Sequence, residues 1–170
     1  MTKCIFLDRD GVINRDRVDY AYDLSHFEIL AGVPQALVKL KKAGYLLVVV
    51  TNQSGIAKDI YTREDMRACH QYMHEQTDHV IDAVYYAPHH PSVTESLTRK
   101  PDTLMFEKAI ARFGIDPGKS WMIGDKERDI IPARQFDIPS ILIGPSKEET
   151  LAQYIVEDLA EATEIILGKL

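Results

Sequence analysis

Residues 3–14, KCIFLDRDGVIN, constrain the fold and the function of this chain more than any other stretch. Within them, Cys4–Leu7 form a short apolar run that is typical of a buried strand. Two carboxylates, Asp8 and Asp10, follow at once, and Gly11 comes next. Anions held this close repel each other unless a cation or a proton lies between them. The stretch therefore indicates a metal site at the end of a strand, although by itself it is equally compatible with a polar turn.

Length and composition narrow the class of protein. A chain of 170 residues, 45% of them hydrophobic, predicts one domain over residues 1–170 with a well-buried core. The net charge of -6 argues against a broad surface for nucleic acid or anionic membrane, so we expect a small-molecule partner, no nucleic acid and no membrane. Cys4 and Cys69 are too few for a disulfide framework, and no signal-peptide core precedes the first strand. We therefore expect a cytoplasmic protein, and a monomer.

Beyond the first strand, helical and apolar segments alternate. Residues 45–50, for example, form a continuous apolar run typical of a strand covered on both faces. Such alternation predicts a doubly wound, mainly parallel α/β sheet with helices on both faces. The further expected strands are 81–86, 120–123 and 140–143, and the expected helices begin at Val33, after Thr62, at Asp102 or Thr103, and after Asp129, with a helical remainder after the last strand.

Three features between these elements bear on the site. Residues 14–27 have no clean period and read as a loop folded over the end of the first strand, where it shapes a pocket or is an ordinary surface excursion. Residues 87–101 form a second loop, with three prolines. His70 and His74 are spaced as metal ligands on a helix but lack the adjacent Glu of the protease pattern, so a solvated helix face is the expectation.

Polar side chains follow several of the expected strands, and ligands of such folds bind outside the carboxyl ends of the strands. If these residues belonged to unrelated turns, we would not expect carboxylates, a hydroxyl and a lysine to recur at the carboxyl ends of different strands. We therefore expect one pocket that collects them. The side chains expected there are Asp8, Asp10, Thr51, Asn52, Lys100 and Asp125.

The ordered motifs resemble those of the haloacid-dehalogenase-like (HAD) phosphatases over residues 3 to about 143. They are Asp8-x-Asp10-Gly11-Val12, Thr51-Asn52, Lys100-Pro101 and Gly124-Asp125-x-x-x-Asp129. The resemblance implies a Rossmann-like HAD core and a phosphoric monoester hydrolase that uses Mg²⁺. No separate cap domain is expected, because the segments between the elements do not exceed the length of a loop.

The resemblance also implies a role for each motif residue. Asp8 would attack phosphorus and form an aspartyl-phosphate, and Mg²⁺ would be held by Asp8, the Asp10 backbone carbonyl and Asp125. The Asp10 side chain would act as general acid for the leaving group and then as base for water. Thr51 and Lys100 would bind the transferring phosphoryl group. Asp129 would orient Lys100 or a metal water, with a plain helix-surface charge as the alternative.

The sequence around these motifs and loops is similar to that of the heptose-1,7-bisphosphate 7-phosphatases and the related histidinol-phosphatases, notably in residues 8–14, 51–55, 88–91 and 99–101. This implies a phosphorylated sugar as substrate and hydrolysis of the 7-phosphate of D-glycero-D-manno-heptose 1,7-bisphosphate, with histidinol phosphate as the nearest alternative. Arg99 would bind the second, non-reacting phosphate, because a guanidinium fork suits a phosphate. The other expected substrate contacts are Asp16, Asp19, Tyr20, Asn52, Gln53, Ser54 and Lys126, the last of which is equally compatible with a solvated position.

One departure from those relatives concerns zinc, which they usually hold in this loop through three cysteines and one histidine. Residues 87–101 contain His89 and His90 but no cysteine, so we expect no structural zinc and a loop braced by prolines. Two further function classes remain open. A polynucleotide 3′-phosphatase shares the motifs, but the net negative charge of the chain and the lack of a basic, aromatic-bearing groove argue against this function. A non-catalytic binding protein on the same fold need not retain both Asp8 and Asp10.

Overall fold

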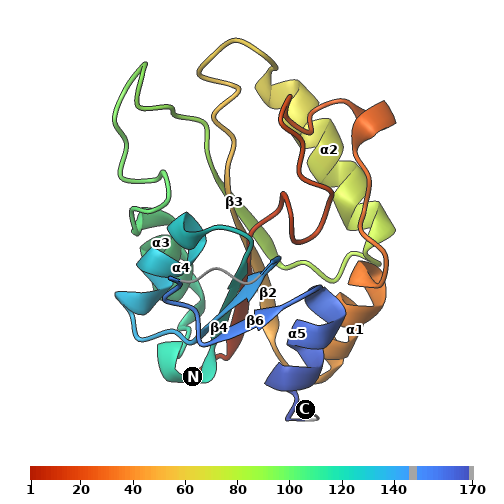
Figure 1. Cartoon of the computed structure of the whole chain (residues 1–170), viewed down its shortest axis with the longest axis vertical. Helices are drawn as coiled ribbons and strands as arrows, with labels where there is room; N and C mark the ends of the chain where they lie inside the picture. The colour runs from red at the N-terminus through yellow and green to blue at the C-terminus, as the bar shows by residue number, and fades with distance from the viewer. Residues whose placement is uncertain (146–148, 169–170) are drawn as a thin grey trace.

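The computed structural model describes residues 1–145 and 149–168, and in them strands and helices alternate around one sheet (Figure 1). The strands are β1 (Cys4–Leu7), β2 (Leu46–Asn52), β3 (Ala83–Ala87), β4 (Trp121–Gly124), β5 (Ser140–Ile143) and β6 (Tyr154–Val156). The helices are α1 (Val33–Lys42), α2 (Arg63–Gln76), α3 (Leu104–Phe113), α4 (Glu127–Arg134) and α5 (Leu159–Ile166), with short 3-10 turns η1 (Leu24–His26) and η2 (Pro117–Lys119).

The sheet has the strand order β3-β2-β1-β4-β5-β6, and every pairing is parallel. In the centre, Ile5 of β1 lies opposite Leu47 of β2 and Trp121 of β4. Parallel neighbours need a crossover that covers a face of the sheet, so the central strands are apolar up to their carboxyl ends, where β2 finishes on Thr51 and Asn52. All four residues of β1 are buried. The predicted doubly wound α/β class is confirmed.

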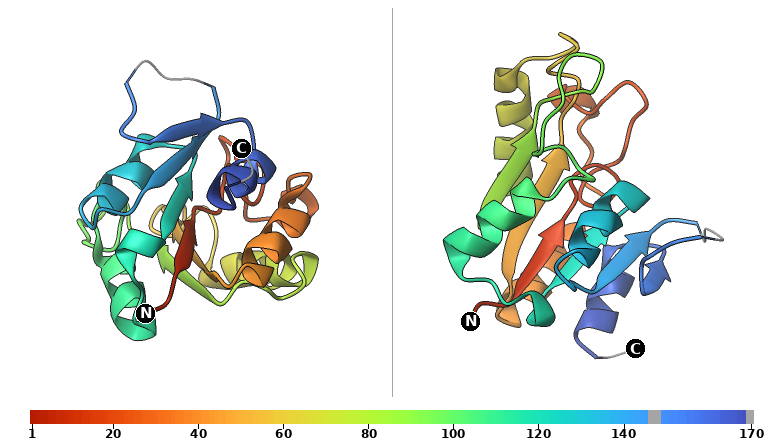
Figure 2. Two further views of the ribbon diagram at one scale, coloured as in Figure 1. Left: turned by 90° about the horizontal axis from the view of Figure 1, so that it is seen from below. Right: turned by 90° about the vertical axis from the view of Figure 1, so that its left-hand side faces the viewer.

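Successive residues of β1 face opposite layers, as the two-residue period of a strand requires. Helices α1, α2 and α5 cover one face of the sheet, and α3 and α4 cover the other (Figure 2). Ile5 and Leu7 belong to the core under the first group, whereas Cys4 and Phe6 belong to the core under the second. Phe6 is fully buried and lies 4.9 Å from the ring of Phe106 on α3. Burial of each such side chain stabilises the fold by about 1.5–3 kcal/mol.

Local signals account for the bounds of α2. Thr62 Oγ1 accepts a hydrogen bond from the Asp65 backbone N–H, and the Asp65 carboxylate accepts one from the Thr62 backbone N–H, which is a reciprocal capping box. At the other end the helix stops at Gln76, and Asp78 and His79 adopt positive φ. In the described part of the chain no helix combines the length and the apolar character needed to cross a bilayer.

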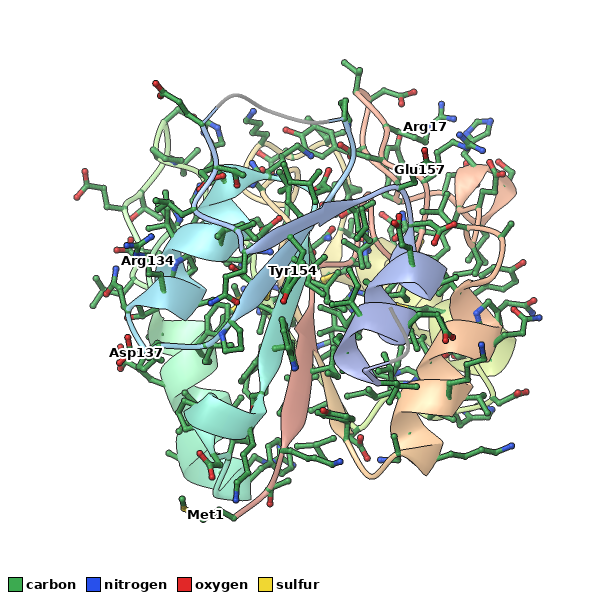
Figure 3. All side chains as sticks on the ribbon, turned by 60° about the horizontal axis from the view of Figure 1, so that its bottom comes forward. Met1, Arg17, Arg134, Asp137, Tyr154 and Glu157 are labelled. Carbon is green, nitrogen blue, oxygen red and sulfur yellow. The ribbon has the colours of Figure 1, made fainter. Side chains whose placement is uncertain are left out.

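Two sequence expectations are wrong. The remainder after β5 is not wholly helical, because β6 pairs with β5, Ile141 opposite Tyr154, before α5 begins (Figure 3 labels Tyr154); residues 146–148 and 169–170 lie outside the described residues. Three residues are too few to show a period, so the pairing with β5 decides the structure. His70 is not on a solvated face either. It lies one turn after the buried Met66, and its burial lowers the pKa of the imidazole to about 3.

Candidate active site

The order of the strands reverses beside β1, which makes the carboxyl ends of β1 and β4 the switch point where ligands of open α/β sheets bind. Asp8 follows β1, and Asp125 follows β4. Asp129, on the first turn of α4, joins them. One carboxylate oxygen of each of these three residues lies within 4.8 Å of the others. The sheet topology therefore brings together carboxylates from distant parts of the chain.

Two glycines allow this close approach. Gly11 has a φ of 83°, and a Cβ at this position would collide with the Asp125 carboxylate. A Cβ at Gly124 would collide with the side chain of Asp129. Only glycine combines this conformational freedom with the missing side chain. The spacing Asp-x-Asp-Gly and Gly-Asp thus reflects the packing of the two loops against each other.

Lys100 is the cation at the centre of the carboxylates. Its Nζ lies 2.9 Å from Asp8 Oδ1 and 2.7 Å from Asp129 Oδ1, and it donates to the Val50 carbonyl at 2.6 Å. Burial alone would lower the pKa of Lys100, but Asp129 and Asp8 raise it above its ordinary value. Lys100 is therefore a buried ammonium ion at every pH near neutrality.

Asn52 anchors the backbone that carries Lys100. Its Oδ1 accepts from the Lys100 N–H at 3.0 Å, and its Nδ2 donates to the Lys100 carbonyl at 3.0 Å. The peptide bond from Lys100 to Pro101 is cis. Because Asn52 also lines the pocket, it both holds this loop and faces the cavity.

Two lysines contact the cluster, Lys100 and Lys126, but Lys126 is shared with Asp16, so the positive charge does not balance the carboxylates. Burial and the neighbouring Asp129 raise the pKa of Asp8 to about 7, although Lys100 opposes this shift. Burial, with Asp129, also raises the pKa of Asp125 despite the opposing charge of Lys126. Asp125 Oδ1 is buried and has no hydrogen-bond partner among the described residues. This excess of negative charge on hard oxygen ligands fits a divalent cation such as Mg²⁺.

The Asp10 side chain lies apart from the cluster of Asp8, Asp125 and Asp129. Its Oδ1 accepts from Arg9 Nη2 and from Asn14 Nδ2, both at 2.9 Å, and its Oδ2 accepts from Gln53 Nε2 at 3.2 Å. Burial would raise the pKa of Asp10, but the charge of Arg9 and these hydrogen bonds hold it below its usual range. The side chain is thus oriented by three donors and is free of the other carboxylates.

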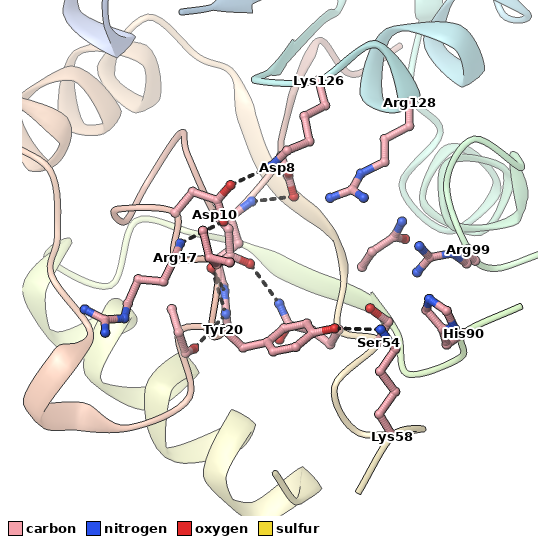
Figure 4. Close-up of a pocket in the computed structure, with 16 residues that line it drawn as sticks. Asp8, Asp10, Arg17, Tyr20, Ser54, Lys58, His90, Arg99, Lys126 and Arg128 are labelled. Carbon is pink, nitrogen blue, oxygen red and sulfur yellow. Dashed lines mark hydrogen bonds and ion pairs between the residues drawn. The ribbon is translucent and has the colours of Figure 1, made fainter. Parts of the chain in front are cut away.

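A cavity of about 290 Å³ opens in front of Asp8 and Asp10 (Figure 4). Several basic side chains face it, which suits an anionic ligand. Lys100, Thr51 and Asp125 do not line the cavity themselves, but each contacts a residue that does. The lining residues are Asp8, Arg9, Asp10, Asp16, Arg17, Val18, Tyr20, Ala21, Asn52, Gln53, Ser54, Lys58, His90, Arg99, Lys126 and Arg128.

Comparisons with known proteins agree on one family. A HAD-hydrolase-like family model matches residues 97–162. The D-glycero-beta-D-manno-heptose-1,7-bisphosphate 7-phosphatase of Haemophilus ducreyi is 39% identical to this chain, over 87% of the chain and 86% of the relative. The chain belongs to the heptose-bisphosphate phosphatase family of HAD-like hydrolases. The enzyme of the same name from Pasteurella multocida is 35% identical, over 99% of this chain and 98% of its own length.

The fold of this HAD phosphatase also matches a solved structure of the family. The D,D-heptose 1,7-bisphosphate phosphatase from B. bronchiseptica, complexed with magnesium and phosphate, superposes with a TM-score of 0.88 and 30% identity, over 99% of this chain and 100% of that one. The predicted family and the predicted enzyme class, a phosphoric monoester hydrolase, are confirmed.

The loop of residues 14–27 in this phosphatase supplies one wall of the cavity. Of the three substrate contacts expected in this loop, two line the cavity and one does not. Tyr20 and Asp16 line the cavity. Asp16 Oδ2 lies 2.6 Å from Lys126 Nζ, which also contacts Asp125 Oδ2 at 3.0 Å. Asp19 is two-thirds exposed, pairs with Arg17 at 3.0 Å, and is not among the lining residues. Lys126 is thus engaged by two carboxylates rather than solvated alone.

The strand end of β2 contributes a chain of hydrogen bonds below the cavity. Gln53 Nε2 donates to the buried Thr51 Oγ1 at 2.9 Å, besides its bond to Asp10, and Gln53 Oε1 accepts from the Tyr61 hydroxyl at 2.6 Å. Tyr61 stacks on Tyr22 of the 14–27 loop, at 5.1 Å between ring centroids. The amide of Gln53 is therefore held with its NH₂ toward Asp10.

Sequence reasoning missed several residues of the site. Arg9, only 1% exposed, contacts Asp10 and donates to the Ala21 carbonyl at 2.9 Å. Its place between two motif aspartates is a signal that was available. Tyr61 carries no such signal, since its role depends on the contact with Gln53. Lys58, His90 and Arg128 also line the cavity. His90 belongs to the 88–91 segment that resembles the family, whereas nothing in the local sequence of Lys58 and Arg128 distinguishes them from surface residues.

Proposed function

We propose that this chain is a Mg²⁺-dependent phosphatase that hydrolyses the 7-phosphate of D-glycero-D-manno-heptose 1,7-bisphosphate through an aspartyl-phosphate on Asp8. The observation that carries the proposal is the cluster of Asp8, Asp125 and Asp129, with Lys100 paired to Asp8 and Asp129, beside a cavity with basic walls. The names of the two bacterial relatives and of the solved B. bronchiseptica enzyme support this substrate. The names of the relatives specify the beta anomer, which we propose for this enzyme as well.

The carboxylates of Asp8 and Asp125 and the backbone carbonyl of Asp10 would hold the metal ion. The orphaned Asp125 Oδ1 and the raised pKa of Asp8 support this set of ligands. When bound, Mg²⁺ supplies positive charge to the phosphoryl oxygens and to the attacking carboxylate. The magnesium in the B. bronchiseptica structure supports the choice of ion.

In the first step an oxygen of Asp8 forms a bond to phosphorus, and the bond from phosphorus to the sugar oxygen breaks. Asp10 donates its proton to the leaving alkoxide. Lys100 holds the Asp8 carboxylate in place and, with Thr51, would bind oxygens of the transferring phosphoryl group, where charge accumulates. In the second step water attacks phosphorus, its proton passes to Asp10, and the bond from phosphorus to Asp8 breaks.

The surroundings of Asp10 suit this double role unequally. Its three donors favour the carboxylate, so Asp10 is ready to act as the base of the second step. The acid form is required in the first step. The negative charge of an incoming phosphate ester raises the pKa of a nearby carboxyl group, so substrate binding itself favours protonated Asp10.

The raised pKa of Asp8 predicts a stability that depends on metal and pH together. Asp8 ionises near pH 7 in the folded chain and near pH 4 in the unfolded chain, so between these values the folded state retains a proton that the unfolded state has released. Without metal, the free energy of unfolding therefore falls as the pH rises through this window. Mg²⁺ stabilises the ionised form, and we expect the increase in Tm caused by Mg²⁺ over EDTA to be larger at about pH 8 than at about pH 5.

Differential scanning fluorimetry in matched buffers measures this effect. The Asp8→Asn variant has no titrating group at this position, so its Mg²⁺-dependent shift should change less with pH. Equal shifts of the wild-type enzyme at both pH values would contradict the metal assignment.

A substrate panel tests the proposed function. We expect kcat/KM for heptose 1,7-bisphosphate to exceed that for histidinol phosphate, because histidinol carries no second phosphate for Arg99. Replacement of Arg99 by Ala should lower kcat/KM for the bisphosphate about 10–100-fold and leave histidinol phosphate unaffected, since a charge-assisted hydrogen bond is lost for one substrate alone. Unchanged bisphosphate turnover by this variant would remove the substrate argument.

Cys4 and Cys69 are buried and unpaired, which supports a reducing compartment. We propose a cytoplasmic monomer that acts on a small phosphorylated sugar without nucleic acid or membrane.

A further inference from the structure

Arg128, on the first turn of α4, lies between Glu127 and Asp129 in the sequence, and other groups engage both of these carboxylates. The Glu127 carboxylate is engaged by Thr150 Oγ1 at 2.9 Å and by the Leu151 N–H at 2.8 Å. Asp129 pairs with Lys100 and accepts from the backbone at the start of α4. Arg128 Nε is buried and has no hydrogen-bond partner within residues 1–145 and 149–168. A buried guanidinium N–H without an acceptor is costly unless a ligand supplies one.

The second observation is that Arg128 shares its part of the cavity with Arg99. Both arginines line this cavity together with His90; in Figure 4 the Arg99 guanidinium lies beside the ring of His90, and the Arg128 side chain extends into the cavity from the side of Lys126. Within the described part of the chain the Arg99 guanidinium makes one hydrogen bond, and it is long, 3.3 Å from Nη1 to the His89 carbonyl. Burial lowers the pKa of Arg99, and the charge of Arg128 lowers it further. Two positive charges therefore lie at the same cavity. An anion bound between them would be attracted by both and would offset their mutual repulsion.

Most of the other cations that line the cavity are paired with carboxylates. Lys126 is held by Asp16 and Asp125, Arg17 is paired with Asp19, and Arg9 is paired with Asp10. Lys58 donates to the Tyr20 hydroxyl at 3.1 Å. Arg99 and Arg128 are also provided by different elements, the loop before α3 and the start of α4, so they can grip a phosphate from two sides. A guanidinium fork binds phosphate oxygens in pairs, and two forks suit a dianion.

We propose that Arg128 is a specificity-determining residue that, opposite Arg99, binds the non-reacting phosphate of the bisphosphate substrate. The inference rests on the proposed function, since the reacting phosphate has to lie at Asp8 for the second phosphate to reach this pair. Its consequence is that Arg128 contributes to binding of a bisphosphate and contributes nothing to a sugar that carries the reacting phosphate alone.

The experiment compares heptose 1,7-bisphosphate with heptose 7-phosphate as substrates of wild type and of Arg128→Ala. We expect KM for the bisphosphate to rise about 10-fold or more, with kcat changed less than about 3-fold, and both constants for the monophosphate to stay at their wild-type values. Arg128→Lys should recover part of the loss, because it restores charge without the fork. Arg134→Ala is the matched control, because Arg134 is an exposed arginine on the same helix and lies outside the cavity (Figure 3).

A double-mutant comparison tests whether the two arginines grip one phosphate. If they do, the variant that lacks both Arg99 and Arg128 should lose less affinity than the product of the two single losses. Equal losses of Arg128→Ala on both substrates, or none on the bisphosphate, would overturn the proposal. No wild-type turnover of either heptose phosphate would instead remove the proposed function, and this inference with it.

Discussion

Replacement of Asp8 by Asn should reduce phosphate-ester turnover by at least about 10⁴-fold, because an amide cannot form the aspartyl-phosphate. The side chain keeps its shape, so the loss would come from the chemistry and from the missing negative charge at the metal site. Steady-state kcat on heptose 1,7-bisphosphate and on an aryl phosphate, at saturating Mg²⁺, measures the effect. Substantial magnesium-supported turnover by this variant would contradict the assignment of Asp8 as nucleophile.

The same variant should remain folded, which separates chemistry from stability. Burial and the neighbouring carboxylates raise the pKa of Asp8 to about 7, so its ionised form is unfavourable in the folded chain without metal. Removal of this charge should leave the Tm in EDTA, at a pH above neutrality, equal to or higher than that of wild type. Asp116→Asn provides a control for the substitution itself, because Asp116 precedes β4 at the opposite end of the sheet. It should change neither activity nor Tm appreciably.

Replacement of Lys100 by Met should be the most destabilising of the site substitutions, at about 3–5 kcal/mol without metal. Lys100 is buried between Asp8 and Asp129, and its loss leaves both carboxylates without their cation and the Val50 carbonyl without its donor. We expect kcat to fall as well, by about 10²–10³-fold, since in the proposed mechanism Lys100 positions the nucleophile and binds the phosphoryl oxygens where charge develops. Urea unfolding in EDTA measures the free energy, and kcat is measured with Mg²⁺.

A matched control uses the same substitution at Lys126. This lysine is 38% exposed and pairs with the half-exposed Asp16 and with Asp125, so Lys126→Met should cost less than about 1 kcal/mol. Mg²⁺ should restore part of the stability of Lys100→Met, since it supplies the missing positive charge. If Lys100→Met in EDTA were as stable as wild type, the account of the buried charges would be wrong.

Local sequence determined much of the framework. The apolar run before Asp8 predicts β1 with its observed bounds, Gly44 ends α1 with a φ of 85°, and Thr62 with Asp65 begins α2 through a capping box. These features act within a few residues, so a short window contains their cause. Parallel-sheet logic also predicts that the carboxyl ends of the strands share one site, and the motif order identifies the family.

Only the tertiary structure decided which side chains meet. Lys100 pairs with Asp8 and Asp129, and Arg9 turns onto Asp10, because the order of the strands and the packing of the loops bring them together. The same holds for β6, which depends on its pairing with β5, and for His70, which α2 buries. Periodicity records which face of an element is covered but does not record the covering partner. For that reason the sequence determined the fold class and the family and predicts the reacting groups, whereas the pairing of their charges and the position of Arg128 near Arg99 follow from packing between residues far apart in the chain.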